Sequence, residues 1–273
     1  MAYKNINKFD LIYITDDIEL AKVIESSNVD RLMVDLETLG KKKRQLGSDT
    51  YISKHRIQNI NPLRKILNKK ELVVRVNPIN KNSKDEINKV LDLGADRIML
   101  PMFKSVKEVE IFLKYVNNKS KSTLLFETPA SISRINQIIE INDFDEAYIG
   151  LNDLKIAFGL DFLFEFLSGG LLEYMSKIFN ANKINFGFGG IAKLGSGSVN
   201  SNLILSEHIR LGSSSVILSS LFRKQSNTFN ENEFLNEIDK IKDEVIRLRK
   251  LDNQFLLDNR DRLYLDIHNY LEA

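Results

Sequence analysis

The chain has no cysteine, no tryptophan and only four prolines among its 273 residues. Without cysteine it can form no disulfide bond, bind no metal through a thiolate and use no cysteine nucleophile. No stretch reaches the roughly 18 consecutive apolar residues that cross a bilayer. The apolar run Leu11–Ile14 is too short for the core of a signal peptide. These absences predict a cytoplasmic protein without a membrane partner.

Neither sign of charge dominates the sequence, which has 39 basic and 37 acidic residues and a net charge of +2. A nucleic-acid-binding protein usually gathers more positive charge on one face, so we expect no nucleic-acid partner. The dense basic run is Lys41-Lys42-Lys43-Arg44. Taken alone, such a run is more typical of a solvated loop than of a binding patch.

Short apolar runs alternate with amphipathic segments, and this pattern is typical of parallel strands joined by crossover helices. The predicted strands are Leu11–Ile14, Arg31–Leu36, Leu72–Val76, Arg97–Leu100, Thr123–Phe126, Glu146–Ile149, Lys183–Gly187 and Val216–Leu218. Eight strand–helix units in a chain of this length favour a closed barrel over an open sheet. The sequence therefore predicts an α/β fold, a (β/α)8 TIM barrel that forms one domain over residues 1–273.

Two of the intervening helices begin with the S-x-x-E signature of a capping box, at Ser83 to Glu86 and at Ser105 to Glu108. Residues 230–273 exceed what eight units require and predict a helical C-terminal extension. Its first helix carries a narrow apolar seam made of Phe234, Ile238, Ile241, Val245 and Leu248. We expect this seam to pack against another subunit, with packing on its own barrel as the alternative.

Charged residues end four of the predicted strands, and catalytic side chains of barrels come from these carboxyl ends. The residues are Asp35 and Glu37, Arg75, Glu127, and Asp153. A charge at such a position is costly to desolvate unless it is paired or binds a metal. Each alone could form a salt bridge or cap a helix, but together on one rim they indicate a site.

The residue types narrow the chemistry of that site. Glu127 and Asp153, without cysteine or a well-placed histidine, suit a divalent cation with hard oxygen ligands, Mg²⁺ or alternatively Mn²⁺. Such an ion can bind a 2-oxo acid through its carboxylate and carbonyl oxygens. A neighbouring Arg75 would stabilise the charge of an enolate oxygen. This combination suits the making or breaking of a bond next to a carbonyl.

Other polar features leave alternatives open. His55, His208 and His268 are expected at surface or capping positions. The glycine-rich segment from Gly187 to Ser198 follows the seventh predicted strand, where barrels often bind phosphate through backbone N–H groups. It lacks the G-K-[ST] ending of a P-loop, and a flexible loop is an equal alternative.

Five blocks occur in order between residues 30 and 218: Asp35-Leu36-Glu37, Val74-Arg75-Val76-Asn77, Gly94 to Pro101, Phe126-Glu127-Thr128, and Ile149 to Leu154. In these blocks the sequence resembles the HpcH/HpaI aldolases and the citrate lyase β-chain. The resemblance implies a modified (β/α)8 barrel that forms a homo-oligomer, a trimer or hexamer, with C-terminal helices exchanged between subunits. It also implies a divalent metal on Glu127 and Asp153 and contact of Arg75 with the substrate carbonyl. Backbone N–H groups around Leu151, Asn152 and Asp153 would hold the substrate carboxylate.

The sequence departs from the family pattern where the family transfers protons. Thr38 stands where the pyruvate aldolases carry a histidine, and Leu125 stands where they tend to carry a glutamine. The aspartate of the citrate-lyase-like branch is also missing. A metal-bound water oriented by Asp35 or Glu37 would then serve as the base.

Next to a metal, the basic run gains weight as a clamp. Lys42, Lys43, Arg44 and Gln45 would hold an anionic substrate that is phosphorylated or linked to coenzyme A. Our first hypothesis is a class-II-type aldolase that acts on a 2-oxo acid such as pyruvate. The alternatives are a citrate-lyase-like acyl-CoA lyase or thioesterase, and a non-catalytic barrel that retains the metal site.

Overall fold

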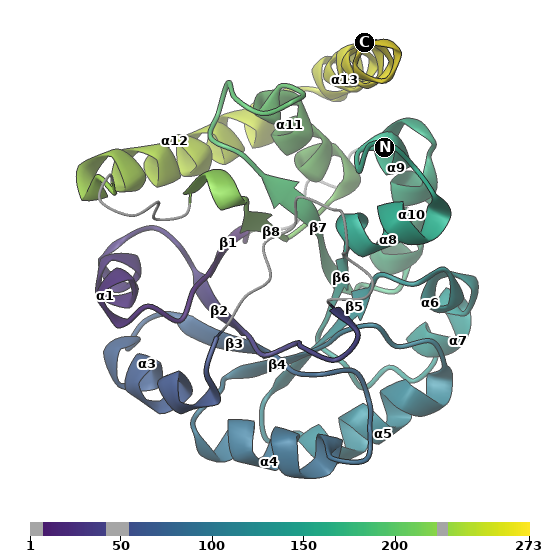
Figure 1. Cartoon of the computed structure of the whole chain (residues 1–273). Coiled ribbons are helices and arrows are strands. Elements are labelled where there is room, and N and C mark those ends of the chain that lie inside the picture. The colour runs from purple at the N-terminus through teal and green to yellow at the C-terminus, as the bar shows by residue number, and fades with distance from the viewer. Residues whose placement is uncertain (1–7, 42–54, 223–228) are drawn as a thin grey trace.

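The computed structural model of the chain describes residues 8–41, 55–222 and 229–273. Eight parallel strands pair in chain order, and β8 pairs with β1 to close the barrel (Figure 1). The strands are β1 (Asp10–Ile14), β2 (Arg31–Asp35), β3 (Glu71–Arg75), β4 (Arg97–Leu100), β5 (Lys121–Phe126), β6 (Glu146–Ile149), β7 (Asn185–Ile191) and β8 (Ser215–Leu218). The predicted (β/α)8 barrel is therefore confirmed, with each expected strand overlapping an observed one.

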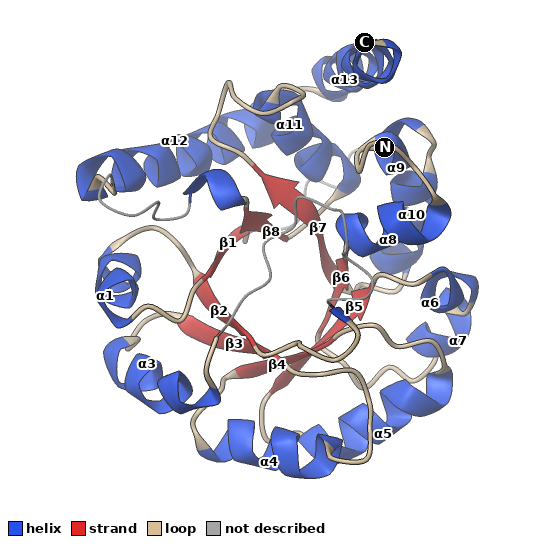
Figure 2. Ribbon diagram, in the orientation of Figure 1, coloured by secondary structure: helices blue, strands red, loops and turns tan. Residues whose placement is uncertain are grey.

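Helices surround this ring of strands on all sides (Figure 2). They are α1 (Ile18–Ser26), η1 (Ile57–Asn59), α3 (Ile60–Ile66), α4 (Ser83–Asp92), α5 (Val106–Val116), α6 (Pro129–Ser133), α7 (Ile135–Ile139), α8 (Leu151–Phe158), α9 (Glu165–Ser168), α10 (Leu171–Ala181), α11 (Ser201–Leu211), η2 (Ser220–Phe222), α12 (Glu231–Lys250) and α13 (Asn253–Glu272). Their apolar faces and the outward-facing strand residues form one continuous core. None of the helices in the described ranges is long and apolar enough to span a bilayer.

Inside the barrel, side chains form three layers because alternate residues of a strand point to the same face. The layer at the amino ends of the strands, which we call the floor, is polar and contains Asp10, Arg31, Glu71, Arg97, Thr123, Glu146 and Ser215. The middle layer is apolar and contains Ile12, Met33, Val73, Met99, Leu125 and Tyr148. The layer at the carboxyl ends, the mouth, is charged again and contains Asp35, Arg75 and Glu127.

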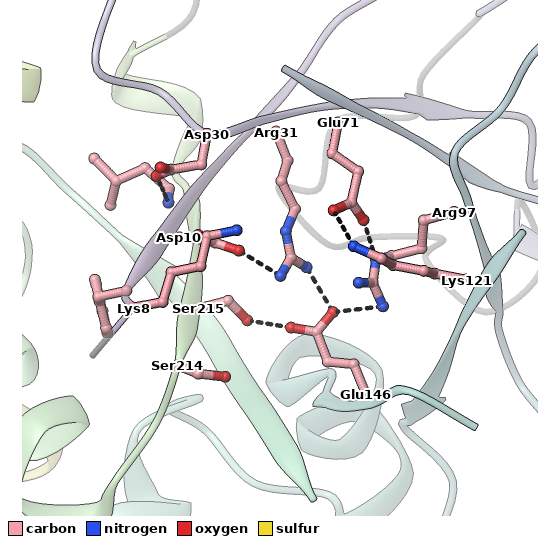
Figure 3. A network of polar contacts seen from close by, with 12 residues as sticks. Lys8, Asp10, Asp30, Arg31, Glu71, Arg97, Lys121, Glu146, Ser214 and Ser215 are labelled. Carbon is pink, nitrogen blue, oxygen red and sulfur yellow. Dashed lines mark hydrogen bonds and ion pairs between the residues drawn. The ribbon is translucent and has the colours of Figure 1, made fainter. Parts of the chain in front are cut away.

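The floor is a connected network of ion pairs, and Glu146 is its hub (Figure 3). Glu146 Oε2 accepts from Arg31 Nη1 at 2.6 Å and lies 3.4 Å from Arg97 Nη1. Its Oε1 accepts from the Ser215 hydroxyl at 2.9 Å. Arg31 also pairs with Asp10 at 2.5 Å, and Arg97 pairs with Glu71. Every buried charge here has an opposite charge beside it, which a buried charge requires.

The capping signatures have different outcomes. At Ser105 and Glu108 both reciprocal hydrogen bonds of the capping box are present. At Ser83 the prediction is wrong, because this residue lies inside α4 and its hydroxyl accepts from the backbone N–H of Asn80. Glu86 instead accepts from the backbone and side chain of Asn77, so the site region uses the acid that would have closed the box.

The C-terminal helices lie on the side of the barrel formed by β7, β8 and β1 (Figure 1). All five seam residues of α12 are buried within this one chain, at 4% exposure or less. The expectation that the seam packs against another subunit is therefore wrong, and the alternative holds. Helix α13 contacts α11 and α9 of the same chain, with Leu263 and Ile267 buried.

Candidate active site at the barrel mouth

Asp35 and Arg75 are neighbours in register on β2 and β3, and their side chains meet in the mouth. Arg75 Nε donates to Asp35 Oδ1 at 2.9 Å, and Arg75 Nη2 donates to Asp35 Oδ2 at 2.8 Å. Burial alone would raise the pKa of Asp35, but Arg75 and then Lys41 hold it below its ordinary value. This bidentate ion pair fixes the plane and direction of the guanidinium group.

Glu37 and Lys41 extend this pair. Glu37 Oε2 lies 3.6 Å from Arg75 Nη2, and Lys41 Nζ donates to Asp35 Oδ2 at 2.6 Å. Lys41 is only 3% exposed, so the first residue of the basic run is neither a solvated loop residue nor part of an open clamp. Lys42, Lys43, Arg44 and Gln45 lie outside the described residues.

Two further contacts hold the turn after β2. The backbone N–H of Asp35 donates to His55 Nδ1 at 2.9 Å, so the imidazole of His55 carries its proton on Nε2. The side-chain oxygen of Asn77 accepts from the backbone N–H groups of Thr38 and Leu39 at 2.9 and 3.0 Å. Thr38, where a proton-transfer residue was expected, is thus held by Asn77 of the R-x-N block.

Glu127 lies across the mouth from Asp35, just after β5, and is 2% exposed. Its Oε1 accepts from the backbone N–H of Met102 at 3.0 Å, and Met102 adopts the left-handed φ of 54° that places this N–H there. At Gly150, a Cβ atom would lie 2.8 Å from Glu127 Oε2, so only glycine leaves room for the carboxylate. The fold thus encloses the Glu127 carboxylate tightly.

Asp153, in the first turn of α8 and 9% exposed, acts electrostatically on Glu127. The pKa of Glu127 is raised well above its ordinary value, first by burial and then by the negative charges of Asp153 and Glu37. A buried carboxylate whose charged form is disfavoured by burial and by a neighbouring acid fits a cation beside it, because a cation offsets both desolvation and repulsion. The residues present therefore fit the divalent metal that the sequence predicts.

The ligand set contributed by the protein is small. Within the described ranges, no three histidine, aspartate or glutamate side chains converge as a metal-binding group. Glu127 and Asp153 alone would leave the remaining positions to water and substrate oxygens, as Mg²⁺ sites that bind substrate commonly do.

The start of α8 lies next to these carboxylates. The N-cap residue of this helix is Gly150, which has no side chain to accept from the first N–H groups, and Asp153 lies in the first turn. The first N–H groups of a helix have no partner within the helix and attract anions. The N–H groups of Leu151 and Asn152 are therefore well placed for a carboxylate.

The glycine-rich segment differs from its predicted position. Gly187, Gly189 and Gly190 belong to β7 itself, which runs to Ile191 and has a register shift against β8 between Gly187 and Gly190. Tyr148 fills this irregularity: its hydroxyl donates to Gly189 O at 2.8 Å and accepts from the Ile217 N–H at 2.8 Å. The remainder, 192–198, is a loop after the strand.

The histidine predictions hold only for His268, which is exposed on α13. His55 is buried beside β2, as described above. His208 is fully buried in α11, stacks on Phe188 at 3.7 Å and contacts the Ser213 hydroxyl through Nδ1 at 2.9 Å. Burial lowers the pKa of His208 to about 3. A single histidine among aliphatic residues gave no sign of this burial.

Comparison with known proteins identifies the family of this chain and solved structures with the same fold. A model of the HpcH/HpaI aldolase/citrate lyase family matches residues 13–167, more than half of the chain. No curated protein sequence matches the chain.

Solved structures share the fold at low sequence identity. An HpcH/HpaI aldolase from Desulfitobacterium hafniense DCB-2 has a TM-score of 0.60 at 12% identity, over 90% of this chain and 95% of the other. An HpcH/HpaI aldolase/citrate lyase family protein from Burkholderia cenocepacia J2315 has a TM-score of 0.62 at 11% identity, over 88% and 95%. Macrophomate synthase has a TM-score of 0.56 at 14% identity, over 78% and 77%.

Proposed function

Because this chain belongs to the HpcH/HpaI aldolase/citrate lyase family, we propose that it is a metal-dependent carbon–carbon lyase of the class-II aldolase type. Its substrate would be a 2-oxo acid such as pyruvate or a larger compound that releases one. The strongest support is that the barrel mouth contains both the Glu127 and Asp153 carboxylates and the Arg75 guanidinium group, which Asp35 orients.

In this proposal Glu127 and Asp153 hold Mg²⁺, or Mn²⁺ in its place. The chemistry that such a cation supplies is polarisation of the substrate's carbonyl oxygen. The N–H groups of Leu151 and Asn152 bind the substrate carboxylate at the start of α8. This leaves the carbon next to the carbonyl facing into the mouth.

Arg75 then stabilises the negative charge that grows on the carbonyl oxygen when a proton or an aldehyde leaves the neighbouring carbon. Burial alone would lower the pKa of Arg75, but Asp35, followed by Glu37 and Glu127, holds it above its ordinary value. The guanidinium group is thus a permanent cation with a fixed direction. It needs no rearrangement when the charge develops.

Between the two acids expected to orient the water that takes the proton, we assign this role to Glu37. Both oxygens of Asp35 are already engaged, Oδ1 by Arg75 Nε and the Glu37 N–H, Oδ2 by Arg75 Nη2 and Lys41. Asp35 therefore positions Arg75, and Glu37 lies beside the same guanidinium group at 3.6 Å.

The acyl-CoA alternative would use a long cationic groove at the mouth. The described residues form a basic groove of about 960 Å³, but Lys69, Lys119 and Lys121 line it at the amino ends of β3 to β5. That is the opposite end of the barrel from Arg75. This groove therefore gives no support to the CoA-linked alternative.

The test is exchange of the methyl protons of pyruvate in heavy water with Mg²⁺, followed by proton NMR. We expect metal-dependent exchange in the wild type and a loss of about 100-fold or more in Arg75→Lys and Asp153→Ala. Arg262→Lys and Asp261→Ala, exposed on α13, are matched controls that should exchange normally. A wild type that exchanges neither pyruvate nor related 2-oxo acids, and binds no Mg²⁺ or Mn²⁺, would favour the non-catalytic barrel instead.

A further inference from the structure

The side chain of Asn77 continues the pairing of β2 with β3 past the ends of the two strands. Just beyond their last register pair, the Leu36 N–H donates to Arg75 O at 2.9 Å. Two residues further along, Asn77 Oδ1 accepts from the N–H groups of Thr38 and Leu39 at 2.9 and 3.0 Å. A side-chain oxygen thus takes the part of a main-chain carbonyl, so the chain can turn here while its N–H groups keep an acceptor.

Glu86 decides which end of the Asn77 amide faces this turn. Its Oε1, in the first turn of α4, accepts from Asn77 Nδ2 at 2.8 Å and from the Asn77 backbone N–H at 3.2 Å. A carboxylate can only accept and a backbone N–H can only donate. The amide NH₂ must therefore face Glu86, and the amide oxygen must face the turn.

The turn held in this way carries Glu37, which is fully buried and whose Oε2 lies 3.6 Å from Arg75 Nη2. The N–H of Glu37 donates to Asp35 Oδ1 at 3.1 Å, and the next N–H along the chain, that of Thr38, donates to Asn77. The peptide groups on both sides of Glu37 are therefore held. A displacement of the second one would move the Glu37 carboxylate relative to Arg75.

We infer that Asn77, oriented by Glu86, is a positioning residue that holds Glu37 beside Arg75 for proton transfer. Asn77 acts through the turn and not on the substrate itself. The inference rests on the proposed function, in which Glu37 orients the water that takes the proton.

Donor and acceptor can be exchanged between these two side chains without a change in their total charge. Asn77→Asp alone sets one carboxylate against another, because the new side chain has no N–H to donate to Glu86. When Glu86→Gln is added, the glutamine NH₂ can donate to the new carboxylate, and its oxygen can still accept from the backbone N–H of residue 77. The second substitution should therefore rescue the first.

The experiment measures proton transfer and binding separately in the full chain. Exchange of the methyl protons of pyruvate in heavy water with Mg²⁺ reports on proton transfer. Calorimetric titration with Mn²⁺, and then with oxalate at saturating Mn²⁺, reports on binding, since oxalate is a planar anion with the two-oxygen geometry of a 2-oxo acid. Asn28→Asp is the matched control. Asn28 Nδ2 also donates to a carboxylate, Asp239 Oδ1 at 2.7 Å, but Asn28 precedes β2 and lies at the opposite end of the barrel from the mouth.

For Asn77→Asp we expect exchange to be at least about tenfold slower, because a small misplacement of a group that orients the reacting water lowers the rate. The affinities for Mn²⁺ and oxalate should stay within about twofold of the wild type, since Glu127 and Asp153 are untouched. Adding Glu86→Gln should bring exchange back to within about threefold of the wild type. Asn28→Asp should exchange and bind normally.

A residue that only stabilised the mouth as a whole would give a different result, with losses in exchange and in both affinities together. That result, or a wild-type exchange rate in Asn77→Asp, or a double variant no faster than Asn77→Asp, would overturn the inference and leave the proposed function intact. If Asn77→Asp does not fold, Glu86→Ala removes the acceptor of the Asn77 amide instead, and exchange at the wild-type rate in that variant would overturn the inference. A wild type that exchanges neither pyruvate nor related 2-oxo acids, and binds no Mn²⁺, would overturn both.

Discussion

Arg75 shows how a single side chain is prepared for chemistry by its neighbours. Its Nε and Nη2 both donate to Asp35, and Asp35 in turn is held by Lys41 and by the Glu37 N–H. Charge-assisted bonds of this kind are short and directional. Separating one member of a buried ion-pair network from its partners costs free energy, so the guanidinium group keeps one orientation. Its remaining edge is what a substrate oxygen would meet.

His208 provides a prediction on pH at this scale. Its pKa is lowered to about 3 by burial, whereas the unfolded chain should titrate near the ordinary value of about 6.5. As pH falls below about 6.5, the unfolded state binds a proton that the folded state cannot accept, so the free energy of unfolding falls. Between pH 7 and pH 4 this group should remove about 3 kcal/mol.

The check is urea unfolding of the wild type and His208→Phe across this pH range. The phenylalanine can still stack on Phe188, but it has no proton to bind. The variant should be less sensitive to acid by about 3 kcal/mol, whatever its stability at pH 7. Parallel pH curves for the two proteins would show that His208 does not carry this dependence.

Single residues were also where the sequence was least informative. Asp35, Glu37, Arg75, Glu127 and Asp153 could be predicted to lie at the mouth because a charge at the end of an apolar strand is conspicuous. Lys41 and His55 could not, because nothing in a basic run or in a loop histidine shows that the chain turns back toward β2. Both were expected at exposed or capping positions.

Among the elements, β7 depends on a side chain from its neighbour β6. The Tyr148 hydroxyl bonds to Gly189 O and to the Ile217 N–H where the ladder between β7 and β8 is interrupted. At Gly187 a Cβ atom would lie 2.5 Å from the Tyr148 ring, so the glycine gives the ring its space. The tyrosine therefore replaces missing backbone hydrogen bonds and shapes the strand end next to α8.

Tyr148→Phe should destabilise the protein by about 1–3 kcal/mol, because two hydrogen bonds would be lost, the one to Gly189 O and the one from the partly buried Ile217 N–H. Tyr13→Phe is the comparison, since the Tyr13 hydroxyl is also buried and donates to Phe222 O at 2.8 Å. Strand β1, which carries Tyr13, pairs with β8 without a register shift, so the cost of this substitution should be smaller. Urea unfolding measures both, and equal costs would argue against a special role for Tyr148 in β7.

The strands could be predicted from the sequence, but the three layers of side chains inside the barrel could not. Strands buried on both faces form nearly continuous apolar runs, which hide the alternation between barrel interior and helix side. The pattern is present in Arg31, Met33 and Asp35, and again in Glu71, Val73 and Arg75. Strand β7 was placed too early because its glycines suggested a loop, although they serve a bulged strand.

For the whole molecule, the barrel interior is divided between stability and function. The floor holds a network of buried ion pairs around Glu146, the middle layer is apolar, and the mouth holds the candidate site. Barrels commonly place activity at the carboxyl ends of their strands and stability at the amino ends. The apolar layer between them should keep the two charged layers energetically separate.

Glu146→Ala tests this separation. It would leave Arg31 and Arg97 buried without their shared partner, and we expect a loss of about 3–5 kcal/mol in the free energy of unfolding. The affinity of the folded variant for Mn²⁺ should stay within about twofold of the wild type. Combined urea unfolding and Mn²⁺ titration would check both values. A large drop in Mn²⁺ affinity would mean that floor and mouth are coupled.

In the proposed function, Glu127 and Asp153 hold one divalent cation beside Arg75, which faces the substrate. The most direct test is a crystal structure of the chain with Mn²⁺ and oxalate, with anomalous diffraction data collected at the manganese edge. We expect one strong anomalous peak within about 2.3 Å of an oxygen from each carboxylate, with an oxalate oxygen beside Arg75. A map without a peak between Glu127 and Asp153, from crystals soaked at saturating Mn²⁺, would contradict it.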